Sequence, residues 1–153
     1  QRQMCIRDSL GTLQSYWTAQ LQILDGDGAV LDDPQWPIVS GQPQLLPARI
    51  AASAEVSESL ISAGSRIRGT VEHSVLSPGV VVEEGAVVRH SVLLDGVRVG
   101  AGVQLENVIV DAGAEIAGGS KRGTAEAVTL IGADGRVAVT ERFDRSATLP
   151  SGF

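Results

Sequence analysis

The two histidines, His73 and His90, are the side chains of this chain whose type and spacing could support catalysis. They stand 17 residues apart, and each precedes a serine in the matching segments "EHSVL" and "RHSVL". A neutral imidazole can take a proton from a hydroxyl or an amine, and so could act as the general base of an acyl transfer. The alternative is that both are solvent-facing corner residues beside Glu72 and Arg89. We favour this alternative because no nearby segment reads as a loop that would shape an acyl-donor site.

The sequence does not combine other reacting groups in the way that chemistry requires. A zinc site of three histidines cannot be built from the two that the chain has. The glycine stretches "GDG" and "GAG" lack the strand and helix that flank a phosphate-binding loop, and no serine lies in a nucleophile elbow. The adjacent carboxylates of Glu83 and Glu84 fit a solvated edge better than an acid–base pair. The sequence therefore predicts no catalytic residue and no metal site in this chain.

A repeat of 17 residues determines where these side chains must lie. One series consists of Gly79, Gly96 and Gly113, and a second consists of Val82, Val99 and Ile116. Inside a unit the spacing is about six residues, which is typical of a triangular coil with three short strands and three corners. No coil of this size can bury its own apolar face, so successive coils must stack. The pattern predicts a mainly β fold, a parallel β-helix of about four coils over residues 50–119. The glycines then form stacked corners, and the β-branched series forms one inward column.

The segment before the repeat reads as a helix and a linker. Apolar residues from Leu13 to Leu24 follow the spacing of an amphipathic helix, which we expect within residues 10–24 with Thr12 as its N-cap. Four prolines in the following segment fix φ and remove hydrogen-bond donors. Residues 25–49 are therefore expected to be an extended linker.

The two ends of the chain differ from the repeat. The segments "VTLIG" and "RVAVT" predict a hairpin within residues 120–153, which would cap the open end of the β-helix and leave a tail. Residues 1–9 follow none of these patterns. We interpret them as a fragment edge or a non-native segment.

The composition is that of a globular domain with an acidic surface. The net charge is −6 and the pI is about 4.8, so we expect neither nucleic acid nor a membrane as a partner. No apolar run approaches the roughly 20 residues that span a bilayer. We expect no secretory signal, because "QRQMCIRDSL" lacks a sustained apolar core. The single cysteine, Cys5, fits a reducing compartment, and we expect a cytoplasmic protein.

The order of these parts resembles the C-terminal part of the bacterial glucose-1-phosphate adenylyltransferase family. The resemblance covers roughly residues 10–140 and rests on the helix segment "GTLQSYW", the connector with "WPI" and "QPQLLPAR", and the coils "SVLSPGVVVEEGAVVRHSVLL". It implies a left-handed β-helix that follows a nucleotidyltransferase domain, of which residues 10–24 would be the last helix. It also implies that the parent enzyme makes ADP-glucose from ATP and glucose 1-phosphate with Mg²⁺, for glycogen synthesis.

In that family the β-helix serves subunit assembly, in a homotetramer, and allosteric control by small anionic metabolites. Basic residues between the two domains bind these effectors. The resemblance assigns this role here to Arg49, which follows "LLPA", and to Arg142, which is shifted by one position. We expect the chain to hold no cofactor of its own and to be inactive without the catalytic domain. Two alternatives stay open: a free-standing hexapeptide-repeat acyltransferase, and the β-helix tail of another sugar-phosphate nucleotidyltransferase.

Overall fold

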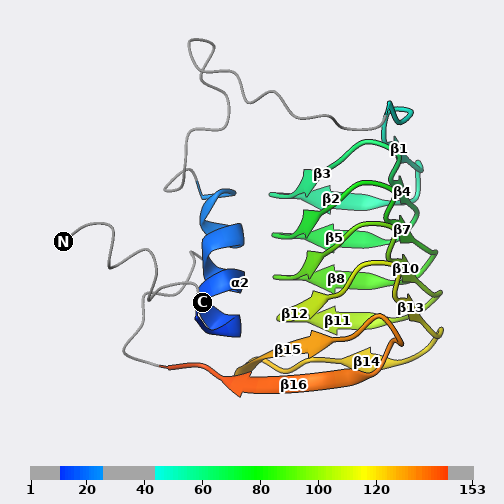
Figure 1. Cartoon of the computed structure of the whole chain (residues 1–153). Helices are drawn as coiled ribbons and strands as arrows, with labels where there is room; N and C mark the ends of the chain where they lie inside the picture. The colour runs from blue at the N-terminus through cyan, green and yellow to red at the C-terminus, as the bar shows by residue number, and fades with distance from the viewer. Residues whose placement is uncertain (1–10, 26–43, 145–153) are drawn as a thin grey trace, which may run out of the picture.

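The computed structural model describes residues 11–25 and 44–144, which form one helix beside a stack of short strands (Figure 1). Helix α2 spans Leu13–Gln22. Sheet A consists of β1 (Arg49–Ile50), β4 (Arg66–Ile67), β7 (Val81–Val82), β10 (Arg98–Val99) and β13 (Glu115–Ile116). Sheet B consists of β2 (Glu55–Ser57), β5 (Thr70–Glu72), β8 (Val87–Arg89), β11 (Gln104–Glu106) and β14 (Lys121–Arg122). Sheet C consists of β3 (Leu60–Ile61), β6 (Val75–Leu76), β9 (Val92–Leu93), β12 (Val108–Val110), β15 (Ala127–Ile131) and β16 (Val137–Arg142).

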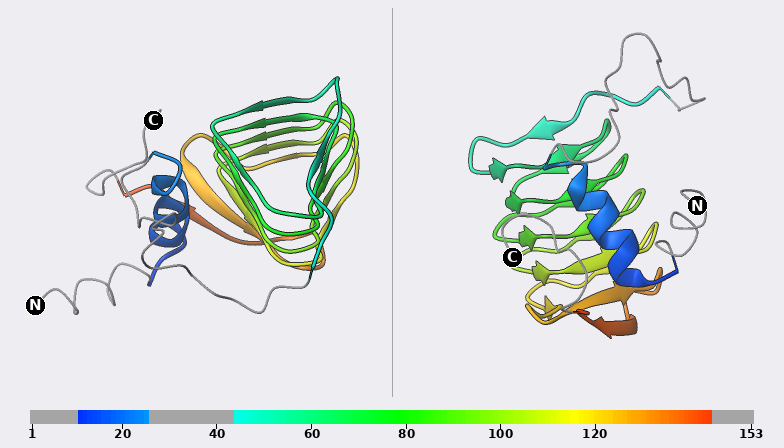
Figure 2. Two further views of the ribbon diagram at one scale, coloured as in Figure 1. Left: turned by 90° about the horizontal axis from the view of Figure 1, so that it is seen from above. Right: turned by 90° about the vertical axis from the view of Figure 1, so that its left-hand side faces the viewer.

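Each turn of the chain contributes one strand to each of the three sheets. Seen from above, the sheets are the three walls of a triangular prism (Figure 2). Neighbouring strands within a wall are parallel, apart from the terminal pair β15 and β16. The predicted parallel β-solenoid with one preceding helix and a terminal hairpin is therefore confirmed. The segment expected as a fragment edge, and most of the expected linker, lie outside the described residues.

The coils extend beyond residue 119, where the apolar sequence pattern ends, and make a fifth turn. Strand β14 pairs with β11 at the usual interval, with Gln104 opposite Lys121. The interval changes only at the third wall, where Val108 lies opposite Thr129, 21 residues later. A polar strand followed by four additional residues hides this turn from a search for apolar repeats. Strand β16 then folds back antiparallel on β15 and ends the stack.

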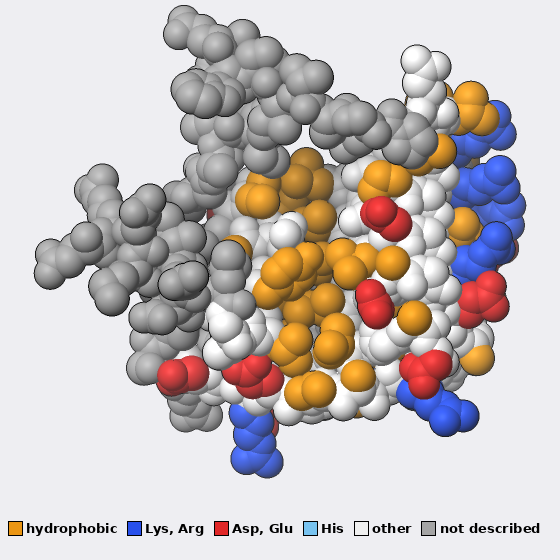
Figure 3. All heavy atoms as spheres, viewed as in Figure 1, with side chains coloured by type: hydrophobic (Ala, Val, Ile, Leu, Met, Phe, Trp, Pro, Cys, Tyr) orange, Lys and Arg blue, Asp and Glu red, His pale blue; other side chains and the backbone are white. Residues whose placement is uncertain are grey.

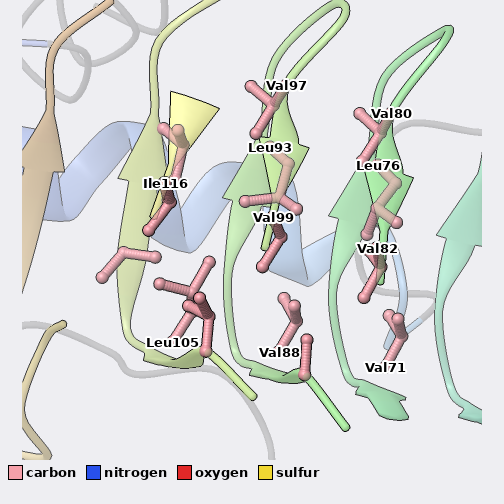
Figure 4. Close-up of a cluster of buried hydrophobic side chains, with 14 of the residues drawn as sticks. Val71, Leu76, Val80, Val82, Val88, Leu93, Val97, Val99, Leu105 and Ile116 are labelled. Atoms are coloured by element: carbon pink, nitrogen blue, oxygen red, sulfur yellow. The ribbon is translucent and has the colours of Figure 1, made fainter. Parts of the chain in front are cut away.

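The inward side chains stack in columns along the axis of the prism (Figure 4). Val99 lies in register with Val82 on one side and Ile116 on the other. Their exposed fractions are 0%, 0% and 3%, in the order Val82, Val99, Ile116. Burying each such side chain contributes about 1.5–3 kcal/mol, and no coil could bury it without the next. The apolar repeat thus supplies the core of the solenoid.

Glycine turns the chain at one corner of every coil. Gly96 has a φ of 69°, and its amide donates to the carbonyl of Pro78 in the preceding turn at 2.9 Å. Gly79 and Gly113 occupy the same place in adjacent turns, with φ of 75° and 70°. A β-carbon would strain this backbone, whereas glycine adopts it freely.

Helix α2 lies against the outer face of sheet C (Figures 1 and 2). It begins after Thr12, whose hydroxyl accepts a hydrogen bond from the Ser15 amide at 3.1 Å, so the predicted N-cap is confirmed. The helix and the sheet share a second hydrophobic core that consists of Trp17, Leu21, Val92, Ile109 and Val128. Phe143, just after β16, packs beside Trp17 with ring centroids 5.3 Å apart. These aromatic rings pack outside the prism, whose narrow interior takes aliphatic side chains.

Candidate functional site

The corner between sheets B and C carries both histidines. One residue of each of the first four turns occupies this corner in a left-handed backbone conformation, with φ of 44° at Glu58, 44° at His73, 45° at His90 and 53° at Asn107. Histidine and asparagine adopt this conformation several times more often than most residues with a side chain. The matching positions of the two histidines therefore satisfy a backbone requirement. Sequence analysis missed Asn107 as a member of this column because its side chain is of another type.

The expectation that both histidines face solvent is wrong. His73 is 4% exposed, and its ring lies between two carboxylates: Asp25 Oδ1 is 3.6 Å from Nε2, and Glu58 Oε2 is 3.6 Å from Nδ1. His90 is half-buried, and its ring centroid is 5.3 Å from that of His73. Asp25 belongs to the turn after helix α2, so the helix end covers a corner that would be open in an isolated solenoid.

The serine after each histidine has a structural role of its own, which explains why the His–Ser dipeptide repeats. Ser74 accepts a hydrogen bond from the Ser91 amide at 3.1 Å, and Ser91 in turn accepts one from the Val108 amide at 3.3 Å. One turn earlier, Ser59 accepts from the Ser74 amide at 3.1 Å. Both Ser74 and Ser91 are 0% exposed. The hydroxyls thus satisfy buried backbone donors from one coil to the next, which is a structural role.

The histidine corner is also a docking point for helix α2. Trp17 Nε1 donates to the backbone carbonyl of His90 at 2.6 Å, and the Trp17 side chain is fully buried. A buried indole needs such an acceptor, and the corner provides one on the outside of the prism. The arrangement therefore joins the helix to the solenoid and does not present the imidazoles to an open surface.

The environment of His90 lowers its pKa below the ordinary value of 6.5. Burial is the main cause, because it disfavours the charged imidazolium, and the nearby charge of His73 acts in the same direction. Arg89 lowers the pKa further, whereas the carboxylates of Glu72 and Glu106 oppose the shift. The folded protein therefore holds His90 in its neutral form more strongly than an unfolded chain does.

We expect stability to fall as the pH drops below about 6.5. In that range the unfolded chain binds a proton at His90 while the folded chain still resists it, so proton uptake favours unfolding. Asparagine adopts the required backbone at the equivalent Asn107, so His90→Asn should keep the fold and reduce the pH dependence. Urea unfolding of both proteins at about pH 7.5 and about pH 5.5 measures the difference.

A third variant separates the contribution of the backbone conformation at residue 90 to stability from the contribution of proton binding by its side chain. His90→Ala places a β-carbon without a polar side chain at a φ of 45°, so it should be less stable than His90→Asn by about 1 kcal/mol at either pH. If His90→Asn lost as much stability on acidification as the original chain, the proton linkage assigned to His90 would be wrong.

The two arginines assigned to effector binding lie far apart. Arg49 is in β1, the first strand of sheet A, and Arg142 ends β16, at the opposite end of the stack and in sheet C. The four steps between the five strands of sheet A alone cover about 19 Å, at roughly 4.8 Å a step. One small anion cannot contact both side chains within one protomer.

The remaining residues singled out in the sequence form no reactive cluster. Glu83 pairs with Arg68 at 3.0 Å, and Glu84 is exposed at the neighbouring corner. Within residues 11–25 and 44–144, no three histidine, cysteine, aspartate or glutamate side chains gather closely enough to hold a metal ion. The one described helix is too short to cross a membrane.

Comparison with known proteins gives a consistent set of relatives. The model of a protein family described as GlmU-like, C-terminal hexapeptide matches residues 45–143. The glucose-1-phosphate adenylyltransferase of Streptomyces coelicolor is 48% identical over 81 residues, which are 52% of this chain and 20% of the relative. The protein of the same name from Bacillus cereus is 45% identical over 80 residues, 52% of this chain and 21% of the relative. The match thus spans only about a fifth of the length of these curated relatives.

Proposed function

Because the chain belongs to the GlmU-like, C-terminal hexapeptide family, we propose that it is the assembly and allosteric-control part of a glucose-1-phosphate adenylyltransferase. The parent enzyme would join ATP and glucose 1-phosphate into ADP-glucose for glycogen synthesis, in the cytoplasm. The 48% identity to an enzyme of that name supports this choice over the β-helix tail of another sugar-phosphate nucleotidyltransferase.

The packing of helix α2 on sheet C carries the regulatory part of the proposal. By the resemblance, α2 is the last helix of the nucleotidyltransferase domain. Trp17 and Leu21 of this helix are 0% exposed and pack on side chains of three successive strands of sheet C. Close-packed interiors transmit strain because they compress little. A shift of the solenoid would therefore move α2 with it, and the solenoid would act as a rigid support for the catalytic domain.

Partners and cofactor are further parts of the proposal. The chain would form a homo-oligomer, and a tetramer fits the resemblance. Val137 and Val139 on the edge strand β16 are 50% and 52% exposed, which supports a contact between copies at this end, since apolar edge strands tend to pair. The Mg²⁺ ion would belong to the nucleotidyltransferase domain, and a small anionic metabolite would act as effector on this one.

The acyltransferase alternative is not favoured. A general base must come within hydrogen-bond reach of the proton that it abstracts. His73 is 4% exposed, with Asp25 and Glu58 beside its ring, and the carbonyl of His90 holds α2. Both histidines thus belong to the contact between helix and solenoid.

The purified chain is expected to form oligomers in light scattering and to make no ADP-glucose by itself. Joined to the nucleotidyltransferase domain that we expect to be encoded upstream of Gly11, it should support ADP-glucose formation that an anionic metabolite changes. Pyrophosphorolysis of ADP-glucose by the chain alone would contradict the proposal. So would acyl-CoA-dependent turnover that is lost in His73→Ala.

A further inference from the structure

The last strand of the solenoid contacts the first turn of helix α2. Glu141 of β16 accepts a hydrogen bond from the Leu13 amide through Oε2 at 2.8 Å, across 128 residues of sequence. The first amides of a helix have no acceptor within it and carry a partial positive charge, so they favour a carboxylate nearby. Helix α2 has no acidic residue in its own first turn. Glu141 therefore supplies from β16 the acceptor and the charge that the helix sequence lacks.

Gln14, the next residue of α2, is bound to the segment that follows β16. The Asp144 amide donates to Gln14 Oε1 at 2.7 Å, and Gln14 Nε2 donates to the Asp144 carbonyl at 3.4 Å. Gln14 is 5% exposed, so its side chain has lost most of its contact with water. A buried amide group needs such partners, because leaving it without them is destabilising. The side chain of Gln14 is thus satisfied when the helix is docked.

The residue between these polar contacts connects them to the terminal hairpin. The Phe143 amide donates to the Glu126 carbonyl at 3.1 Å, just before β15 begins. On its other side, the Phe143 ring packs against Trp17 of α2. Residues 141–144 are therefore held by the hairpin and by α2 together, at the end of the stack where α2 begins (Figure 1).

The rest of the contact between α2 and sheet C consists mainly of apolar side chains. In the space-filling view, hydrophobic side chains gather in the middle of the face formed by sheet C (Figure 3). Apolar attraction has no preferred direction, so it holds a helix against a sheet without fixing its rotation or its position along the sheet. A hydrogen bond forms only over a narrow range of distance and angle. The bonds at Leu13 and Gln14, with that from Trp17 to the His90 carbonyl, therefore fix where α2 lies.

We propose that residues 141–144 form a clasp that sets the position of α2, with Glu141 and Gln14 as its positioning residues. When the clasp opens, α2 loses its fixed start while the solenoid stays folded, because the stacked core of the coils includes no residue of the helix. The terminal hairpin then has a second role besides ending the stack. This inference rests on the proposed function for its consequence: the clasp would decide how firmly the solenoid holds the last helix of the catalytic domain.

Hydrogen exchange of the 153-residue chain, followed by mass spectrometry, tests the clasp. We expect Glu141→Ala to speed exchange of the α2 amides at residues 17–22 by about tenfold or more, because a hydrogen bond to a charged group is lost. The central strands β8 and β11 should exchange at the original rate. Glu141→Gln keeps an acceptor oxygen without the charge, so its increase should be smaller. Glu55→Ala, at an exposed glutamate in β2 of sheet B, is the matched control and should change the exchange of α2 by less than about twofold.

A second substitution tests whether the contacts act as one unit. Gln14→Leu keeps most of the side-chain volume without the polar atoms that bind Asp144, and it should speed exchange of α2 by a similar factor. If residues 141–144 open as one clasp, either change alone frees them. The double variant should then exchange only slightly faster than the single variants. Multiplication of the two factors would show two independent contacts and would overturn the inference.

Three other results would also contradict the clasp. They are an unchanged exchange rate of α2 in Glu141→Ala, an equal rate in Glu141→Gln and Glu141→Ala, and an equal increase in β8 and β11, which would mark general destabilisation. Circular dichroism of each variant verifies that it is folded. Exchange is measured without ADP-glucose formation or assembly. A negative result therefore leaves the proposed function standing, and failure of that function leaves the exchange result intact.

Discussion

The substitution Val99→Asp is expected to prevent cooperative folding of the solenoid. Val99 is 0% exposed, with Val82 and Ile116 stacked on its two sides, so a carboxylate here would have no partner and no water. Burying an unpaired charge costs several kcal/mol, which is comparable to the 5–15 kcal/mol that stabilises a typical domain. Thermal unfolding followed by circular dichroism at 218 nm, roughly the β-sheet minimum, should show the loss of the transition.

The matched control is an aspartate at the open end of the same column. Ile50 in β1 lies in register with Ile67 and is 54% exposed, so Ile50→Asp places its carboxylate in water and should change stability by about 1 kcal/mol or less. If the two variants unfolded at similar temperatures, the stacked column would not be the source of stability that we assign to it.

The substitution Trp17→Ala is expected to release helix α2 from the solenoid. It removes a fully buried side chain, its contact with Phe143, and the hydrogen bond to the His90 carbonyl. Replacing a buried tryptophan by alanine costs about 3–5 kcal/mol. The helix has only ten residues and would not be stable alone. Hydrogen exchange should therefore become fast for the amides of α2 while those of the central strands stay protected.

The variant Trp17→Phe gives a graded control for this prediction. It keeps an aromatic ring in the contact and loses the indole hydrogen bond, so the protection of α2 should be intermediate. Unchanged protection of the α2 amides in Trp17→Ala would show that the contact with sheet C does not hold the helix. In the proposed parent enzyme, Trp17→Ala should also weaken the response to an effector, because the solenoid would no longer position the last catalytic-domain helix.

The sequence by itself determined the solenoid. In a stack of coils each residue contacts the one a full turn later, so a fixed interval in the sequence becomes a column in space. Val82, Val99 and Ile116 could be placed in one column for this reason. The fifth turn was missed because its second strand is polar and four residues are inserted before its third.

Only the tertiary structure decided how helix α2 lies on the solenoid. No period connects residues 13–22 to the coils, and a linker of unrelated pattern separates them, so sequence spacing carries no information about their contact. The packing of Trp17 on sheet C, with Asp25 beside His73, turns an apparent solvent corner into a buried one. The sequence could show that the two histidines are equivalent, but their burial, and with it the lowered pKa of His90, depends on an element far away in the chain.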